Sequence, residues 1–335
     1  MATSETEQGT ATPTATATKT KRRWTGKTLL VAGIALVVLG VMIYRRPTLA
    51  VYEVNRFQSW RAGLEQHDVK LGSYRIHYLV STGGSRPLVL VHGLQGRGED
   101  WLQLIPLLNR GGYKIYALDL LGFGRSDRPD VEYSIAQQVD ILRQFMDSQD
   151  LQQADVAGWS MGGWVSLKFA AEHPERVRRL VLMDSAGLKF DAVNAPALRP
   201  KTEGDLAHMM AILTPHPQAI PGFFARDLLR NFAREDWITD RALKSMYAGK
   251  DLMDGKMQTV TIPVLIVWGK QDVLTPATIG EQMHQAMPQS LLTLMDGCGH
   301  LAPIECKGRV AESVEKFLKA DPPLPAARQE IPEAH

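Results

Sequence analysis

The sequence lacks an excess of charge of either sign, and it has little cysteine. Its 335 residues contain 38 lysines and arginines and 36 aspartates and glutamates, which gives a formal net charge of +2. A nucleic-acid-binding domain normally presents a concentrated basic surface, so this balance argues against nucleic acid as a partner. The two cysteines, Cys298 and Cys306, show no metal-ligand pattern with neighbouring histidines, and we expect free thiols. No internal repeat is evident.

The first part of the chain also lacks large apolar side chains that could build a core. Residues 1–20 are mostly threonine, alanine and serine. Such a composition cannot bury enough apolar surface to fold, and we expect disorder there. The chain as a whole is 44% apolar, which is enough for one large domain or for one domain with an insertion.

An apolar run at 28–46 follows a basic cluster and ends in two arginines. A cleaved signal peptide, a buried helix and a membrane anchor are the three interpretations. The run is apolar on every face, which disfavours a buried helix, and the residues after it match a cleavage site poorly. We therefore expect a single transmembrane signal anchor. As a helix, Thr28–Tyr44 would span about 25 Å of a ~30 Å hydrocarbon layer, so Lys27 and the arginine pair must reach the interface.

The basic residues around this run bear on its orientation. Those before it are slightly more numerous than those after it, which favours the amino end in the cytoplasm. The large domain is then on the periplasmic or extracellular side. After the run, Val51, Val54, Phe57 and Trp60 repeat every three positions, and this short helix could rest on the bilayer or pack on the domain. We favour packing.

From residue 74 onward, stretches of strand character alternate with helical patterns. Tyr74–Val80 alternates like an antiparallel strand, whereas PLVLVHG, KIYALDL, ADVAG, RRLVLMD and PVLIVWG are typical of buried strands. This order predicts an α/β fold in which helices cover both faces of a mostly parallel sheet, with ligands at the carboxyl ends of the strands. The segment 188–258 interrupts the alternation and carries aromatic residues among charged ones. We interpret it as a helical cap over that edge.

The expected organisation has six parts. They are a disordered basic segment (1–27), a transmembrane anchor (28–46), an amphipathic connector (47–66), an α/β core (67–187 and 259–320), a helical cap (188–258) and a C-terminal tail (321–335).

Gly158, Ser160 and Gly162 form a GxSxG pattern between a predicted strand and a predicted helix. In that setting the small flanking residues relieve crowding at a strained serine, whose hydroxyl projects from the turn. The helix that follows also offers backbone N–H groups to an anion. Ser160 is therefore a candidate nucleophile, and it requires a base and a group that orients the base.

The base is expected in a loop near the end of the chain. His300 lies between the strand-like SLLTLM and the last helical pattern, which makes it the candidate. The orienting acid lies between serine and histidine if the chain order is Ser, Asp, His. Asp272 and Asp184 each follow a predicted strand; we favour Asp272, because its loop can turn toward the histidine loop, and Asp184 stays as the alternative. Asp296 occupies a turn and suits a local structural role.

Attack on an ester carbonyl creates a negative oxygen that needs two aimed N–H donors. Met161, directly after the nucleophile, supplies one, and the loop VHGLQG supplies the other, with Leu94 the best candidate. We expect the substrate to contact Trp159 and, in the cap, Phe223 and Phe224, because a cap over strand ends is where a hydrophobic pocket forms.

Five motifs, in this order, resemble the α/β-hydrolase fold family: VHGLQG, LDLLGFGRSDRP, GWSMGG, VWGKQD and GCGH. The resemblance implies a triad of Ser160, Asp272 and His300, an oxyanion hole at Leu94 and Met161, and no metal or organic cofactor. It excludes the branches that use an aspartate nucleophile. The anchor together with SMGG, WGKQD and CGH is further similar to membrane-anchored monoacylglycerol lipases and related bacterial lipases.

The sequence therefore predicts a membrane-anchored serine hydrolase of carboxylic esters, with a small-molecule or lipid ester and the membrane as its partners. Two other functions stay open. Carbon–carbon bond hydrolases of dienoic acids share the GxSxG turn and the triad, although the anchor argues against their soluble anionic substrates. A non-catalytic ligand-binding protein could use the same fold, although every expected catalytic group is present.

Overall fold

The computed structural model describes residues 31, 33–34, 40–41, 43–108 and 111–333. The chain divides into two units between Tyr44 and Arg45, and the fold below is that of the second unit. Most of the predicted anchor lies outside the described residues, and so does the segment 1–20 for which disorder was expected. In the part of the chain that is described, no helix is long and apolar enough to cross a membrane.

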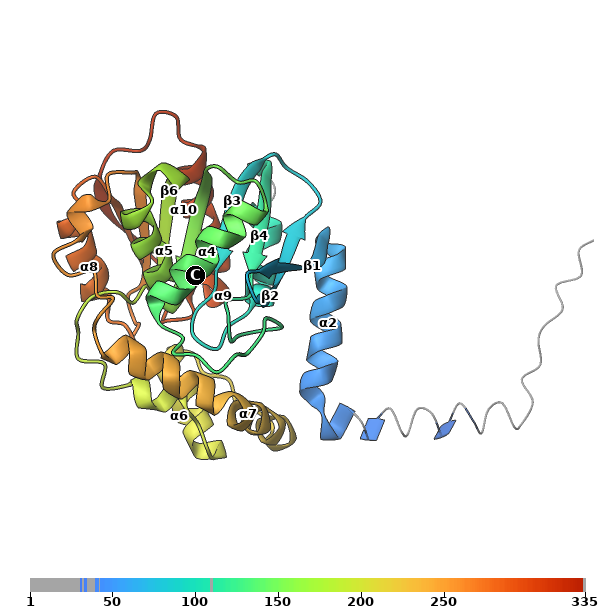
Figure 1. The fold of residues 1–335 in the computed structure, drawn as a ribbon. Helices are drawn as coiled ribbons and strands as arrows, with labels where there is room; N and C mark the ends of the chain where they lie inside the picture. The colour runs from blue at the N-terminus through green and yellow to red at the C-terminus, as the bar shows by residue number, and fades with distance from the viewer. Residues whose placement is uncertain (1–30, 32, 35–39, 42, 109–110, 334–335) are drawn as a thin grey trace, which may run out of the picture. The chain divides into compact units, whose positions relative to one another are not determined.

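A nine-stranded sheet forms the centre of the second unit (Figure 1). Its spatial order is β1-β2-β4-β3-β5-β6-β7-β8-β9. Strand β2 pairs antiparallel with β1 and β4, and all other neighbours pair in parallel, which confirms the mostly parallel sheet. The strands are β1 Leu64–Leu71, β2 Tyr74–Ser81, β3 Arg86–Val91, β4 Tyr113–Leu118, β5 Ala154–Trp159, β6 Val177–Met183, β7 Val264–Gly269, β8 Leu291–Met295 and β9 Ala327–Ile331.

Helices cover both faces of this sheet, as the alternating pattern predicts. Successive residues of a strand point to opposite faces, so Val89 and Val91 of β3 join one apolar core and Leu88 and Leu90 join the other. The first core is closed by α4, α5 and α8, the second by η1, α3, α9 and α10. These elements are η1 Gly98–Gln103, α3 Ile105–Leu108, α4 Ile135–Ser148, α5 Met161–Glu172, α8 Ala277–Ala286, α9 Ala302–Glu305 and α10 Lys307–Lys319.

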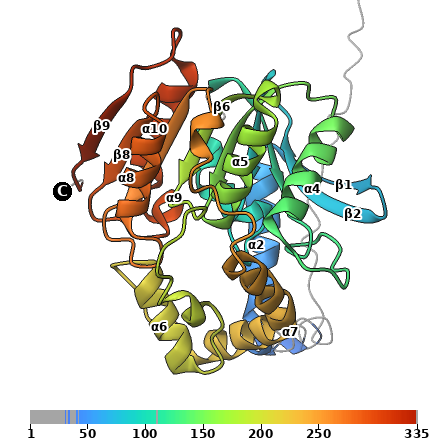
Figure 2. The ribbon, with the colours of Figure 1, turned by 60° about the vertical axis from the view of Figure 1, so that its left-hand side comes forward.

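The chain between β6 and β7 forms a separate helical lobe below the sheet (Figure 2). The lobe has a small core of its own around Leu206, Met209 and Ala225. Thr202 begins α6 with a capping box, in which its hydroxyl accepts the N–H of Asp205 and the Asp205 carboxylate accepts the N–H of Thr202. The elements here are η4 Ala195–Leu198, α6 Glu203–Leu213, α7 Gly222–Tyr247 and η5 Met257–Thr259. All lie in or directly beside the predicted cap segment.

Helix α2, Pro47–Arg61, packs on the domain with a different face from the one expected. Ser59 is buried, and Thr48 bonds to α7. By contrast, the apolar side chains predicted to pack are exposed to solvent. Val51, Val54, Phe57 and Trp60 are 44%, 52%, 56% and 71% exposed. That prediction was wrong, because Thr48 at the start of this helix bonds to Asp227 of α7, whereas these four apolar side chains face solvent.

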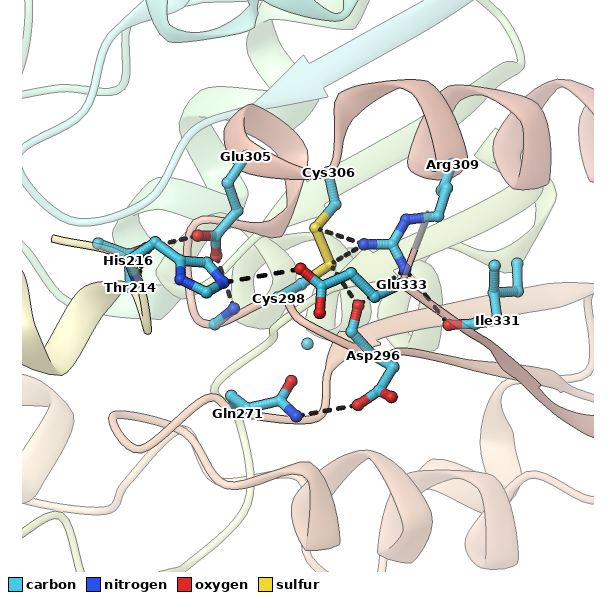
Figure 3. The surroundings of a disulfide bond; sticks show 12 residues. Thr214, His216, Gln271, Asp296, Cys298, Glu305, Cys306, Arg309, Ile331 and Glu333 are labelled. Carbon is cyan, nitrogen blue, oxygen red and sulfur yellow. Dashed lines mark hydrogen bonds and ion pairs between the residues drawn. A yellow bond between two sulfur atoms is a disulfide. The ribbon is translucent and has the colours of Figure 1, made fainter. Parts of the chain in front are cut away.

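Two features near the carboxyl end also differ from expectation. Part of the predicted tail forms β9, which pairs in parallel with β8. Cys298 and Cys306, expected to be free thiols, are joined by a disulfide with their Cα atoms 6.2 Å apart (Figure 3). The spacing of the cysteines along the chain does not reveal that Cys306 returns beside Cys298 after the short helix α9.

Candidate active site

Ser160 occupies a strained backbone position between β5 and α5. Its φ of 56° and ψ of −120° are unusual for a residue with a side chain. The neighbouring glycines permit this turn: a Cβ on Gly158 would lie 2.2 Å from the carbonyl oxygen of Gly162, and one on Gly162 would lie 2.2 Å from that of Val91. The GxSxG spacing thus reflects crowding of backbone against backbone, which leaves the serine hydroxyl at the carboxyl end of β5.

Three loops bring Ser160, His300 and Asp272 into one hydrogen-bonded series. The Nε2 atom of His300 lies 2.9 Å from the Ser160 hydroxyl, and its Nδ1 atom lies 2.8 Å from Oδ2 of Asp272. A carboxylate can only accept, so the ring proton is on Nδ1 and Nε2 is free to accept from the serine hydroxyl. His300 is 4% exposed, so water competes little for these bonds.

The acid of this series is held by its own loop. Oδ1 of Asp272 accepts the backbone N–H groups of Leu274 and Thr275, at 2.8 and 2.9 Å, and Oδ2 accepts the Thr275 hydroxyl at 2.7 Å. Thr275 was not among the site residues expected from the sequence. Its signal is the D-x-x-T spacing, in which a carboxylate bonds to the backbone and the hydroxyl three residues later.

The alternative acid, Asp184, does not take part in this series. It is fully buried at the end of β6, where its Oδ1 accepts the N–H of Gly269 at 2.7 Å. Its Oδ2 finds no hydrogen-bond partner among the described residues. Burial, reinforced by the charge of nearby Asp272, raises the pKa of Asp184 well above its ordinary value. Asp184 is therefore a buried carboxyl behind the site whose raised pKa favours the protonated form, and the structure joins Asp272 to His300 instead.

The two predicted oxyanion donors belong to segments that border Ser160. Met161 is the first residue of α5, so its N–H has no partner within the helix. Leu94 lines the same cavity as Ser160, and the loop that carries it approaches closely, because a Cβ on Gly93 would lie 3.2 Å from that of Ser160. Gln95, at a φ of 62°, fixes this loop to the cap by donating to the Leu198 carbonyl oxygen.

The ring of His92 holds the loop that carries Leu94 by hydrogen bonds from both of its nitrogen atoms. Its Nδ1–H donates to the carbonyl oxygen of Gly93 at 2.7 Å, and its Nε2 accepts the N–H of Leu120 at 2.9 Å. The second bond requires the neutral ring, because a protonated Nε2 cannot accept. Complete burial lowers the pKa of His92 to about 4, so this form persists at neutral pH.

A cavity of about 440 Å³ opens at Ser160 and continues under the cap. Most of its wall is apolar, and the only basic side chain among its lining residues, Lys189, is exposed to solvent. Residues from three parts of the cap segment contribute apolar side chains to the wall: Leu188, Phe190, Leu198, Leu243, Met246 and Leu252. A hydrophobic group bound to Ser160 would leave water on entering this cavity.

The three side chains predicted to contact the substrate are placed elsewhere. Trp159 is buried in the second core, where its Nε1–H donates to the carbonyl oxygen of His300 at 2.8 Å. Phe224 lines a different hollow between α2 and α7, and Phe223 is not among the residues that line the cavity at Ser160. Aromatic content within the cap does not reveal which helix face turns toward the nucleophile, and other residues line the cavity, among them Leu243, Met246 and Phe190.

Comparison with known proteins finds a matching hydrolase family and relatives that are named as hydrolases. The model of the alpha/beta hydrolase family matches residues 88–313. A 2-hydroxy-6-oxo-6-(2'-aminophenyl)hexa-2,4-dienoic acid hydrolase of Metapseudomonas resinovorans is 30% identical over 269 residues, covering 75% of this chain and 89% of that protein. Lipase 3 of Moraxella sp. (strain TA144) is 28% identical over 247 residues, 69% of this chain and 76% of that protein.

A solved structure extends the similarity over more of the chain. The crystal structure of a membrane phospholipase A, described as a bacterial virulence factor, matches with a TM-score of 0.76 and 25% identity, covering 88% of this chain and 98% of that one. The match of the family model over most of the chain, together with the fold, leads to one conclusion. The chain belongs to the alpha/beta hydrolase family.

Proposed function

We propose that this protein hydrolyses carboxylic esters of lipid-like acids through an acyl-enzyme on Ser160. His300 takes the serine proton as the hydroxyl attacks the ester carbonyl, and Asp272 holds the ring and stabilises the imidazolium. The N–H groups of Leu94 and Met161 stabilise the oxyanion. His300 then protonates the departing alcohol, and water releases the acid by the same steps in reverse order.

The observation that carries this proposal is the apolar cavity that begins at the nucleophile. A single acyl chain requires a long wall without charge, which this cavity provides. A dienoic acid carries a carboxylate, which requires a desolvated cation or several donors when buried. The only cation among the residues that line the cavity is Lys189, whose side chain is exposed, and the hydroxyl of Thr275 already bonds to Asp272. The wall therefore favours a neutral lipid ester such as a monoacylglycerol over a dienoate.

Carbon–carbon bond hydrolysis is the second candidate, because the relative from Metapseudomonas resinovorans acts on a dienoic acid by its name. The two reactions share the nucleophile and base, so only the substrate distinguishes them. The test compares turnover of p-nitrophenyl esters and monoacylglycerols of increasing chain length with turnover of a ring-cleavage dienoate. Ser160→Ala serves as the control for each. Faster turnover of the dienoate would replace our proposal with the second one.

We also propose that the protein is anchored in a membrane by 28–46 and rests on it with helix α2. Support comes from the faces of α2. The N–H and the hydroxyl of Thr48 donate to Oδ2 of Asp227 in α7, at 3.0 and 2.5 Å, whereas the side chains of Phe57 and Trp60 are exposed. Exposed aromatic side chains near arginines are typical of a helix at a lipid interface.

The disulfide between Cys298 and Cys306 supports a position of the catalytic domain on the periplasmic or extracellular side, because disulfides persist in oxidising compartments. Protease treatment of sealed membranes tests this orientation. Digestion of the domain from the cytoplasmic face would overturn it, whatever the enzymatic activity proves to be.

A further inference from the structure

The catalytic histidine lies inside a loop that the disulfide closes. Cys298 is two residues before His300 and Cys306 is six residues after it, and the bond between their sulfur atoms joins the two ends of this segment (Figure 3). Both cysteines belong to the second apolar core. Both cysteines are buried, at 0% and 7% exposure. The bridge therefore constrains the backbone that carries the imidazole.

Cys298 is also a contact point between the histidine loop and the acid loop. Its carbonyl oxygen accepts the N–H of Gln271, the residue before Asp272, at 2.9 Å. The two loops approach so closely that a Cβ on Gly269 would lie 2.5 Å from that same oxygen. Movement of Cys298 would change the position of the acid relative to the base.

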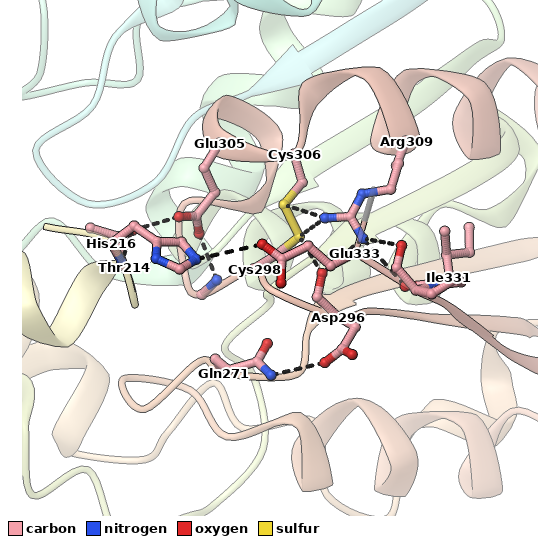
Figure 4. A network of polar contacts seen from close by, with 12 residues as sticks. Thr214, His216, Gln271, Asp296, Cys298, Glu305, Cys306, Arg309, Ile331 and Glu333 are labelled. Carbon is pink, nitrogen blue, oxygen red and sulfur yellow. Dashed lines mark hydrogen bonds and ion pairs between the residues drawn. A yellow bond between two sulfur atoms is a disulfide. The ribbon is translucent and has the colours of Figure 1, made fainter. Parts of the chain in front are cut away.

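Glu305 fixes the same loop from its other side. Its Oε1 accepts the N–H of Gly299 at 2.6 Å, and its Oε2 accepts the hydroxyl of Thr214, at the end of cap helix α6, at 2.5 Å (Figure 4). The N–H of Leu301 donates to the Leu213 carbonyl oxygen at 3.2 Å. The backbone on both sides of His300 is thus bonded to the disulfide segment and to the cap.

Arg309 covers the disulfide and connects it to the last strand. Its guanidinium nitrogen Nη2 lies 3.0 and 3.1 Å from the two sulfur atoms, and Nη1 donates to the carbonyl oxygen of Asp296 at 2.8 Å and to that of Pro332 at 2.8 Å. Loss of the bridge would therefore change the contacts of Arg309 with both sulfur atoms, at the two ends of the segment that carries the base.

We propose that the Cys298–Cys306 disulfide and Glu305 are positioning residues for His300, so that full turnover requires the oxidised bridge. The inference rests on the proposed function of Ser160 and His300 as nucleophile and base. A reducing dithiol would give two electrons and two protons to the S–S bond, so that two thiols form and the reductant becomes its disulfide. A phosphine would give two electrons and become its oxide, with water supplying the oxygen atom and the two protons. The chain has no other cysteine. Any effect of reductant thus reports this one bond.

The test compares full-length protein in detergent with and without a phosphine reductant, beside a Cys298→Ser/Cys306→Ser variant. Steady-state hydrolysis of p-nitrophenyl butyrate and the rate of Ser160 labelling by a fluorophosphonate are measured, with thiol content checked by mass spectrometry. Because a displacement of about 1 Å at a catalytic group can cost ~100-fold, we expect kcat to fall by at least about 10-fold. KM should stay within about two-fold, since the substrate cavity is separate from the bridge.

Two controls separate positioning from general damage. Reoxidation of the reduced wild type should restore kcat, and the double-serine variant should be insensitive to reductant. Circular dichroism reports whether each form is folded. Glu305→Ala should lower kcat in the same way, whereas Glu305→Gln, which keeps an acceptor for the Gly299 N–H, should recover most of it.

The outcomes that count against the proposal are distinct from those that count against the ester-hydrolase function. If the reduced wild type and the double-serine variant keep the kcat and labelling rate of the oxidised protein, the bridge does not position His300. If Glu305→Ala is as active as wild type, the carboxylate does not position it either. Failure of the oxidised wild type to label or to hydrolyse any ester would instead reject the proposed function itself.

Discussion

Replacing Asp272 by asparagine should reverse the hydrogen bonding of His300 without changing the shape of the side chain. Oδ1 of Asp272 accepts two backbone N–H groups, from Leu274 and Thr275, so the amide oxygen of asparagine must take that position. The amide nitrogen then takes the position of Oδ2, which lies 2.8 Å from Nδ1 of His300. An amide nitrogen can only donate, so the ring proton moves to Nε2. The ring then presents a hydrogen, in place of a lone pair, to Ser160.

The expected loss in kcat for Asp272→Asn is ~10⁴-fold, about 5.4 kcal/mol of activation free energy, which is the typical effect of this wrong tautomer in a serine triad. KM should change by less than about three-fold, since the acid does not touch the substrate. The assay is steady-state hydrolysis of p-nitrophenyl butyrate, with the fold of each variant checked by circular dichroism.

Asp184→Asn is the matched control. Burial raises the pKa of Asp184 well above its ordinary value, and its side chain bonds to Gly269 and not to His300, so an amide should replace it with kcat within about three-fold. The raised pKa also means that the folded protein holds a proton that the unfolded chain releases as the pH rises above about 4. Stability is therefore lost with rising pH, and the asparagine variant should lack that loss. Retention of more than about a tenth of kcat in Asp272→Asn, with a large loss in Asp184→Asn, would refute this account of the triad.

Three further predictions concern the GxSxG turn at Ser160, the cavity and the loop that carries His92 and Leu94. Gly162→Ala places a Cβ 2.2 Å from the Val91 carbonyl oxygen and should lower the free energy of unfolding by more than about 2 kcal/mol in urea titrations. Leu252→Trp narrows the cavity, so kcat/KM should fall more for long-chain than for short-chain p-nitrophenyl esters; an equal fall would contradict the acyl-cavity assignment. Between pH 6.5 and about 4 the unfolded chain protonates His92 and the folded protein does not, so stability should fall on acidification by up to about 3 kcal/mol. Burial raises the pKa of Asp100 to about 6, which opposes this trend, so the fall should be steeper in Asp100→Asn.

Local pattern was sufficient for the elements that build the core and for the nucleophile. The buried strands are short apolar runs, and the turn at Ser160 requires glycine at positions where any Cβ would meet backbone atoms. His300 could be located because it lies between a recognisable strand and the last amphipathic helix. In each case the physical requirement is met within a few residues of the side chain concerned, so it is visible in the sequence.

The sequence by itself therefore determined the mostly parallel sheet, the GxSxG turn at Ser160 and the order of serine, acid and histidine along the chain. Only the tertiary structure decided between Asp272 and Asp184, because both follow a strand and they differ in which loop faces His300. It also decided the apolar wall of the cavity, the outward aromatic face of α2 and the pairing of Cys298 with Cys306. These features depend on how segments distant along the chain approach each other, and no local pattern encodes that approach.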